Sequence, residues 1–268
     1  MCLLIVLSRV DVGAPLVVVA NRDERFDRPA TAATVLAEAG PRVLGGRDEL
    51  AGGTWLAVNE HGVVAGLTNR PSPSGRDPEK RSRGELPLAL ARHTNASSAI
   101  EELAEQVHSE DYNAAWLLVG DRHSLYYVAL GGSGAPEVEC LAPGPYVLGN
   151  DPLRGASPKT ARVRERVGAI ARAAGGDQHA LLQQVLSDHT IPAEAEAPSG
   201  AEAGASGAPE RPAQLGAACV HTDGYGTRSA ALIRVPGEGL PQLWVADGPP
   251  CRTPFVDVSP LWSAPALP

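Results

Sequence analysis

The residues best suited to chemistry lie at the start of the chain, where Cys2 follows Met1. A cysteine that becomes the first residue carries a thiol nucleophile and a free α-amino base. Their reference pKa values, about 8.5 for the thiol and about 8 for the α-amine, let a proton pass between them near neutral pH at little cost. Removal of Met1 is therefore expected to create a two-group nucleophilic catalyst. A small apolar residue in a buried strand is the alternative interpretation of Cys2.

Two apolar segments near the start, residues 2–8 and 16–21, are predicted to pair as a hairpin. The stretch between them carries turn residues, with Gly13 near its centre. For a turn centred there, the residue numbers of two paired residues on the antiparallel strands sum to about 25. Cys2 is then expected opposite Asp23, within a residue or two.

The polar run Asn21-Arg22-Asp23-Glu24 ends the second apolar segment. In the expected register Asp23 shares the face of Cys2, where its carboxylate can hold the α-ammonium group. Arg22, if the strand ends there, places positive charge near the sulfur and favours the thiolate. Asn21 and Glu24 are candidates for substrate binding. A strand end that enters a turn is the alternative interpretation of the run.

Four residues further along the chain complete the candidate site. Asn69 and Asn150 each follow an apolar strand, where turn formation is the common role of asparagine. Beside a nucleophile, the Asn69 amide can donate to an oxyanion, and Asn150 can position the α-amine or the substrate carbonyl. Arg228 begins a later strand, where a solvated arginine is the alternative. Trp55 is either a core residue or a platform for stacking on a substrate.

Composition and spacing exclude several classes of function. The seven histidines and four cysteines show no HExxH motif and no CxxC pair, so neither a metal site nor a disulfide framework is predicted. No glycine-rich nucleotide motif is present. The formal net charge of −8 argues against nucleic acid or an anionic membrane surface as the main partner. With no secretory leader and no spanning segment, we expect a soluble, cytoplasmic protein. The sequence does not predict its oligomeric state.

The length of 268 residues and the 43% hydrophobic content suit a single domain, 1–268, with one large core. Strands are followed by two helices, more strands, two more helices and final strands, which favours an α+β fold of two stacked sheets with helices outside. Residues 193–214 are rich in Ala, Glu, Gly, Pro and Ser and predict a mobile loop. Further strands are predicted at 52–58, 62–69, 114–119, 124–130, 138–141, 146–149, 219–221, 228–235, 242–246 and 252–258, and helices at 82–93, 97–108, 157–174 and 177–189.

Taken together, seven short motifs resemble the NRDE family, which includes the transport and Golgi organisation protein two homologues, along most of the chain. The resemblance implies an N-terminal-nucleophile hydrolase fold, a four-layer αββα sandwich of mainly antiparallel sheets, similar to cysteine-type members that cleave amide bonds. It also implies that Arg228 approaches the nucleophile. Those hydrolases commonly space their Arg and Asp further apart than the adjacent pair here. The motifs are Met1-Cys2, Asn21-Arg22-Asp23-Glu24 with Arg28-Pro29, Gly52-Gly53-Thr54-Trp55-Leu56, Leu67-Thr68-Asn69, Arg83-Gly84-Glu85-Leu86, Leu148-Gly149-Asn150 and Gly226-Thr227-Arg228-Ser229.

Two hypotheses of function follow. The first is a cysteine amidohydrolase that acts on a small acyl amide without a cofactor or metal. In it Cys2 attacks the acyl carbon, the α-amine shuttles the proton, Asn69 with a backbone N–H stabilises the oxyanion, and Arg22 tunes the thiol. The second is a non-enzymatic protein that binds haem or a lipid acyl group in the same cleft, since the family has been connected with haem trafficking and lipid homeostasis.

Overall fold

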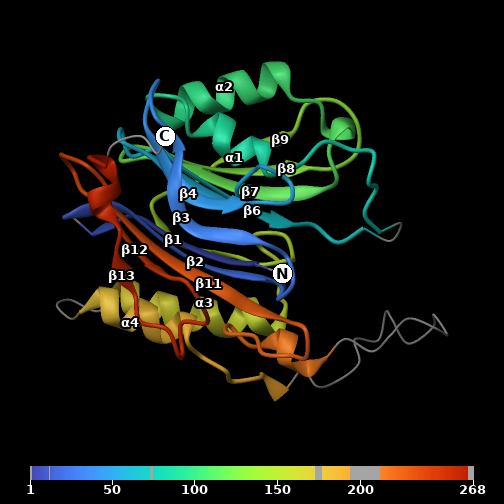
Figure 1. Cartoon of the computed structure of the whole chain (residues 1–268), viewed down its shortest axis with the longest axis vertical. Helices are drawn as coiled ribbons and strands as arrows, with labels where there is room; N and C mark the ends of the chain where they lie inside the picture. The colour runs from blue at the N-terminus through green and yellow to red at the C-terminus, as the bar shows by residue number, and fades with distance from the viewer. Residues whose placement is uncertain (1, 12, 73–74, 173–176, 194–211, 265–268) are drawn as a thin grey trace.

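A computed structural model of the chain describes residues 2–11, 13–72, 75–172, 177–193 and 212–264. Two antiparallel sheets lie face to face, and helices cover their outer faces (Figure 1). The expected α+β sandwich of four layers is confirmed. Most of the predicted mobile loop, 193–214, lies outside the described residues.

The first sheet, called sheet A, contains the start of the chain. Its central strands β1 and β2 are apolar on both faces because one face packs against the other sheet and the opposite face packs against helices. The six strands lie in the order β10 (Gly144–Leu148), β1 (Cys2–Asp11), β2 (Ala14–Arg25), β11 (Tyr225–Val235), β12 (Gln242–Ala246) and β13 (Val256–Asp257).

The second sheet, called sheet B, has seven strands, of which the first two were not predicted. β3 consists mainly of Ala and Thr and is half-buried along its length, so no alternation of polar and apolar residues marks it. β4 contains Gly45 and Gly46, which read as turn residues in the sequence. In sheet order the strands are β3 (Ala30–Ala37), β4 (Val43–Asp48), β5 (Leu56–Asn59), β6 (Val64–Asn69), β7 (Ala115–Gly120), β8 (Leu125–Leu130) and β9 (Glu137–Cys140).

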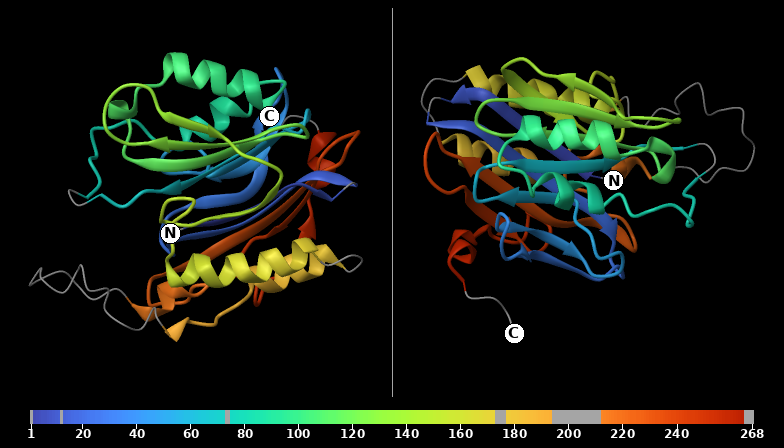
Figure 2. Two further views of the ribbon diagram at one scale, coloured as in Figure 1. Left: turned by 180° about the vertical axis from the view of Figure 1, so that it is seen from behind. Right: turned by 90° about the horizontal axis from the view of Figure 1, so that it is seen from above.

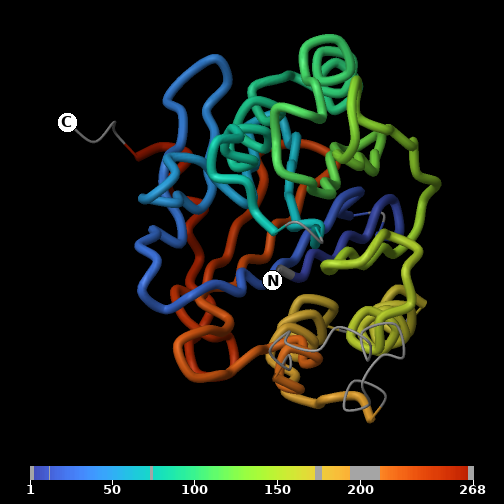
Figure 3. Tube along the Cα trace, turned by 90° about the vertical axis from the view of Figure 1, so that its right-hand side faces the viewer, coloured from blue at the N-terminus to red at the C-terminus, as the bar shows by residue number. Residues whose placement is uncertain are grey.

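All four predicted helices are present, two on each outer face. α1 (Glu85–Leu90) and α2 (Ala96–Gln106) pack on sheet B, and α3 (Pro158–Arg172) and α4 (Gln178–Leu186) pack on sheet A. Figures 2 and 3 show the two pairs on opposite sides of the strands. Among the described residues, no helix is long and apolar enough to cross a membrane. Short 3₁₀ helices lie at Ser109–Asp111, Ala213–Gly216 and Ser259–Trp262.

The end of the chain departs from the predicted strands. The strand expected at 219–221 is a single bridge between His221 and Gly226. The strand expected at 252–258 is reduced to β13. β11 begins earlier than predicted, at Tyr225, because the glycine-rich turn before it closes in fewer residues. The earlier start matters because it brings Tyr225 beside the end of β2.

Two of the sequence motifs meet where the backbones of Gly53 and Gly84 touch. The Thr54 N–H donates to the Gly84 carbonyl oxygen over 2.9 Å. A Cβ added to Gly53 would lie 2.5 Å from the Gly84 carbonyl carbon. Only glycine fits this approach, which fixes the start of α1 against the segment leading to β5.

Replacement of Gly53 by alanine should therefore lower the free energy of unfolding by about 1–3 kcal/mol, the usual cost of overpacking. The matched control is Gly237→Ala, where an added Cβ meets nothing within 4 Å. Urea unfolding should leave the control within about 0.5 kcal/mol of the wild type. Equal stabilities of the two variants would contradict the close approach.

Candidate active site

The backbone of Cys2 lies beside another candidate residue, Arg22. The predicted hairpin of β1 and β2 is confirmed, and Cys2 pairs with Arg22. On the other side of β1, Leu4 pairs with Leu148 of β10. The ladder between these two strands ends at this pair, and Asn150 follows two residues later in the chain. Position 2 therefore has Arg22 as its paired neighbour, while Asn150 lies just beyond the end of β10.

Cys2 pairs one residue away from Asp23, within the predicted range of a residue or two, and the cause of the offset is a β-bulge. At the turn, Asp11 pairs with Ala14, which matches the predicted sum of 25. The register then shifts between Ser8 and Asp11, where Arg9 has a φ of 54°. Because successive strand residues point to opposite faces, the shift gives Arg22 the face that was expected for Asp23.

Arg22 faces the space between the sheets and is held by its neighbours. Its guanidinium carbon lies 4.3 Å from the centre of the Trp55 ring, a cation–π contact. One of its nitrogens lies 3.6 Å from an Asp48 oxygen. Arg28 donates to the same oxygen over 2.7 Å and lies 3.8 Å from Glu24. Trp55 thus packs against the Arg22 guanidinium, and Glu24 forms an ion pair with Arg28.

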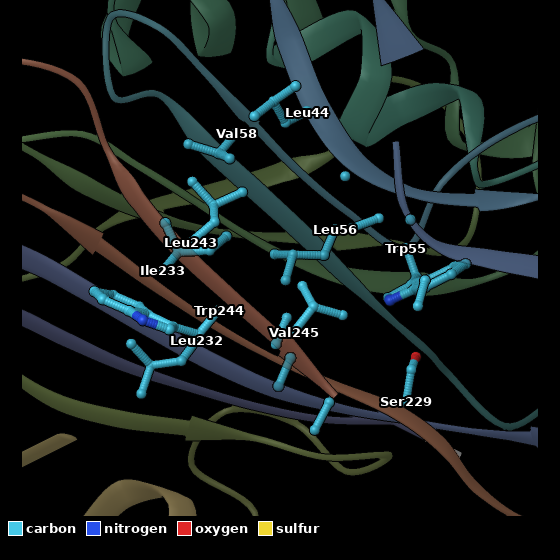
Figure 4. Close-up of a pocket in the computed structure, with 17 residues that line it drawn as sticks. Leu44, Trp55, Leu56, Val58, Ser229, Leu232, Ile233, Leu243, Trp244 and Val245 are labelled. Carbon is cyan, nitrogen blue, oxygen red and sulfur yellow. The ribbon is translucent and has the colours of Figure 1, made fainter. Parts of the chain in front are cut away.

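The space beside Trp55 is nearly filled. A cavity of about 20 Å³ lies there between the sheets, lined by apolar side chains of β5, β11 and β12 and by Ser229 (Figure 4). Such a volume holds about one water molecule. This space is therefore too small to hold a small organic molecule.

The carboxylate of Asp48 is the anionic centre of this cluster. Burial acts to raise its pKa, but hydrogen bonds from Arg28 and from the Ala51 N–H, with the charges of Arg28 and Arg22, hold the pKa below its usual value. Asp48 therefore stays ionised at neutral pH and keeps Arg22 in place.

Asn21 points to the helical side of sheet A and is buried. Its side-chain nitrogen donates to the carbonyl oxygens of Leu186, over 2.8 Å, and Ala218, over 2.9 Å. These bonds tie the end of α4 and the segment before β11 to the centre of the sheet. The expected substrate-binding role of Asn21 is wrong, because its side chain is 1% exposed and bonded to the protein interior.

The Asp23 carboxylate also points to the helical side. It accepts a hydrogen bond from the Thr227 hydroxyl over 2.6 Å, and the ammonium group of Lys159 in α3 lies 3.4 Å away. All three side chains are buried. The Tyr225 hydroxyl donates to the Asp23 carbonyl oxygen over 2.9 Å. Asp23 thus joins the end of β2 to α3 and to the start of β11.

Asn69 and Asn150 meet at the mouth of an open cavity of about 470 Å³. The side-chain nitrogen of Asn150 donates to the Asn69 carbonyl oxygen over 2.5 Å. The side-chain oxygen of Asn150 is buried and has no hydrogen-bond donor within the part of the chain that the structure describes. The other residues that line the cavity are Arg70, Pro71, Pro212, Leu215, Thr222, Asp223 and Tyr225.

Arg228 lies at the register shift in β11, beside the end of β2. One guanidinium nitrogen donates to three carbonyl oxygens at the end of β2 and in the loop after it, those of Arg25, Phe26 and Arg28, each over 2.9 Å. Its contacts are therefore with this loop, which it holds against the sheet. The expected approach of Arg228 to the nucleophile is not seen in these contacts.

The chain matches known proteins along most of its length. A sequence profile of the Transport and Golgi organisation 2 family matches residues 1–243. The chain belongs to this family. The homologue from Homo sapiens is 30% identical over 237 residues, which cover 84% of this chain and 83% of the relative. The homologue from Bos taurus is 31% identical over the same length and the same shares of both chains.

Two solved structures share the fold of this family member. Penicillin V acylase from Agrobacterium tumefaciens is 10% identical, with a TM-score of 0.56 and coverage of 97% of this chain and 86% of the acylase. The Caenorhabditis elegans orthologue of N-acylethanolamine-hydrolyzing acid amidase is 11% identical, with a TM-score of 0.53 and coverage of 88% and 94%. At these identities the likeness shows the fold, which is the αββα fold that the sequence implied.

Sequence reasoning missed several residues that organise the site. Asp48 lies in β4, which was not predicted, and nothing in the sequence of α3 marks Lys159 as buried. Thr227 belongs to a motif found in the sequence, but Arg228 of the same motif was taken as the candidate residue. The structure also gathers His189, Cys219, His221 and Cys251, although no metal-ligating cluster was predicted. Only the spacing of Cys219 and His221 was a local hint.

The Asp48 cluster predicts a dependence of stability on pH. Its folded pKa is below the unfolded value, so the stabilisation by the Asp48 charge is present above about pH 4 and is lost as the pH falls through the folded pKa. At pH 7, Asp48→Asn should lower the free energy of unfolding by about 1.5–3 kcal/mol. Urea unfolding at a series of pH values should show this difference shrinking below about pH 4. A difference that stays constant down to pH 3 would contradict the assignment.

Proposed function

We propose that this protein is a cysteine amidohydrolase whose nucleophile is Cys2 and whose substrate is a small acyl amide. The observation that carries the proposal is the pairing of Cys2 with Arg22. Asn150, two residues beyond the last β10 residue that pairs with β1, bonds to Asn69, and both asparagines line a cavity. Support comes from the shared fold, because both neighbouring structures carry the names of enzymes that act on acyl amides, an acylase and an amidase.

In this proposal, removal of Met1 leaves Cys2 with a free α-amine. The amine takes the proton of the thiol, and the sulfur attacks the carbonyl carbon of the amide. The tetrahedral intermediate collapses when the ammonium group returns the proton to the leaving nitrogen, which departs as an amine. Water then attacks the thioester, with the α-amine as general base, and releases a carboxylic acid and the thiol.

Asn150 suits the task of holding the α-amine. Its side-chain nitrogen donates a hydrogen bond to the Asn69 carbonyl oxygen, and its buried side-chain oxygen accepts none from the described residues. A buried acceptor without a donor is costly. In this proposal, an α-ammonium group at Cys2 offers donors to this oxygen.

Arg22 supplies a fixed positive charge beside the nucleophile. Trp55 packs on its guanidinium, and Asp48 anchors one end of it, so the group cannot swing away. A cation next to a thiol lowers the pKa of the thiol and raises the thiolate fraction. Asp23 is a positioning residue in this proposal, since its hydrogen bonds from Thr227 and Tyr225 hold the start of β11, and hence Tyr225 in the cavity wall.

The Asn69 side chain is assigned to the oxyanion, together with a backbone N–H. It stands at the end of β6 in sheet B and lines the cavity. The cavity volume of about 470 Å³ is in the range of small-molecule sites. Its lining combines Pro71 and Leu215 with the polar groups of Asn69 and Asn150, which suits an apolar acyl chain with an amide head.

The test is hydrolysis of a panel of fluorogenic N-acyl amides of increasing chain length. Cys2→Ala should abolish turnover, because alanine is also small enough to allow removal of Met1 and leaves only the thiol missing. Cys140→Ala, at an exposed cysteine, is the matched control and should keep wild-type rates. Asn69→Ala should lower kcat by about 10²–10³.

The proposal fails if Cys2→Ala retains the wild-type rate, or if no member of the panel is turned over by protein that has lost Met1. The carrier alternative is tested on the same samples by titration with haem and with a fluorescent fatty-acyl probe. Binding that is equal in the wild type and in Cys2→Ala, without turnover, favours the carrier over the hydrolase.

A further inference from the structure

Four side chains that can bind a metal meet on the helical side of sheet A. His189 follows α4, Cys219 and His221 precede β11, and Cys251 lies in the turn after β12. Their sulfur and ring nitrogen atoms all lie within 4.8 Å of one another. None of the four lines the cavity assigned to catalysis.

The distances suit a tetrahedral centre. The Nε2 atom of His221 lies 3.3 Å from the sulfur of Cys251 and 3.7 Å from the sulfur of Cys219. Zinc bonds of about 2.3 Å to sulfur and about 2.0 Å to nitrogen put neighbouring ligand atoms at roughly 3.3–3.8 Å. The rings of His189 and His221 converge, with centroids 4.9 Å apart. Only a small inward movement of the more distant atoms is needed.

The orientation of His189 is set by a hydrogen bond outside the ligand shell. Its Nδ1 lies 3.2 Å from the Cys219 carbonyl oxygen, and because a carbonyl only accepts, Nδ1 must carry the proton. The lone pair of the imidazole is then on Nε2. A metal-binding histidine is commonly oriented in this way by a carbonyl partner.

The backbone that carries these ligands is fixed in place. Asp188, next to His189, pairs with Arg162 over 3.1 Å and with Arg166 over 2.6 Å, both in α3. The Cys219 N–H donates to the Asp188 carbonyl oxygen over 2.9 Å. Two of the four ligands are thus held together before any ion binds.

We infer that His189, Cys219, His221 and Cys251 form a structural zinc site. Two thiolates and two neutral imidazoles are a ligand set typical of Zn²⁺, and four protein ligands close the tetrahedron, as in structural sites. The site joins three segments that follow α4, precede β11 and follow β12. It is separate from the proposed hydrolytic chemistry and does not depend on it.

Formation of the site requires two protons to leave. Each cysteine gives up its S–H proton to solvent as its sulfur binds the ion, and the two thiolate charges balance Zn²⁺. Without the ion, burial and the neighbouring Cys251 raise the pKa of the Cys219 thiol to about 12. Burial, His189 and Arg252 lower the pKa of His221, partly opposed by Asp23, so its ring is neutral as a ligand must be. His189 is exposed and offers a path of entry.

The experiment uses the full chain, reduced, stripped with a chelator and then given one equivalent of Zn²⁺ or Co²⁺. After gel filtration we expect about one zinc ion per chain by elemental analysis. Cobalt should give the visible bands of a tetrahedral ion and a thiolate charge-transfer band. Zinc should also raise the midpoint of urea unfolding, since an ion that binds only the folded state stabilises it.

His189→Ala and Cys251→Ser change an exposed and a half-buried ligand, so both variants should fold. Each should weaken zinc binding by more than the roughly 10–100-fold that loss of an outer-shell partner costs. Cys140→Ser is the matched control and should bind like the wild type. The inference is overturned if the wild type holds no zinc, if the two variants hold as much as the control, or if thiol blocking during isolation shows a Cys219–Cys251 disulfide.

Discussion

The period of two along β2 is the constraint on which the rest of the structure depends. It divides the run Asn21–Glu24 between the faces of sheet A. Arg22 and Glu24 join Asp48 and Arg28 at the interface between the sheets. Asn21 and Asp23 join the helical layer. A motif that looks like one polar cluster in the sequence therefore serves two separate parts of the molecule.

The helical side of this division is tied by hydrogen bonds to the start of β11. Asn21 bonds to the Ala218 carbonyl, next to Cys219. Asp23 binds the Thr227 hydroxyl, which accepts from the Val220 N–H between the two proposed zinc ligands. The segment that carries Cys219 and His221 is thus hydrogen-bonded to the start of β11, where the Thr222 hydroxyl donates to the Tyr225 carbonyl oxygen in the cavity wall.

Much of the fold was predictable, since long apolar strands and amphipathic helices follow from hydrophobic pattern alone. The opening hairpin and the four helices are examples. Asn69 and Asn150 were singled out because they follow apolar strands and match family motifs, and it is the fold that brings them into contact. The bulge near Arg9 was not predictable, because it depends on a backbone angle that no local pattern demands. β3 was missed because a half-buried strand of small residues has no alternation. The clustered His and Cys side chains are brought together by the fold, from segments 30 residues apart.

The central claim, a nucleophile with its own α-amine at position 2, is tested most directly by tandem mass spectrometry of protein treated with a thiol-reactive acyl probe. The account predicts a first residue of Cys2, with the probe on that cysteine in preference to Cys140, Cys219 and Cys251. A chain that keeps Met1, or a label that falls on the other cysteines while Cys2 stays unmodified, would contradict it.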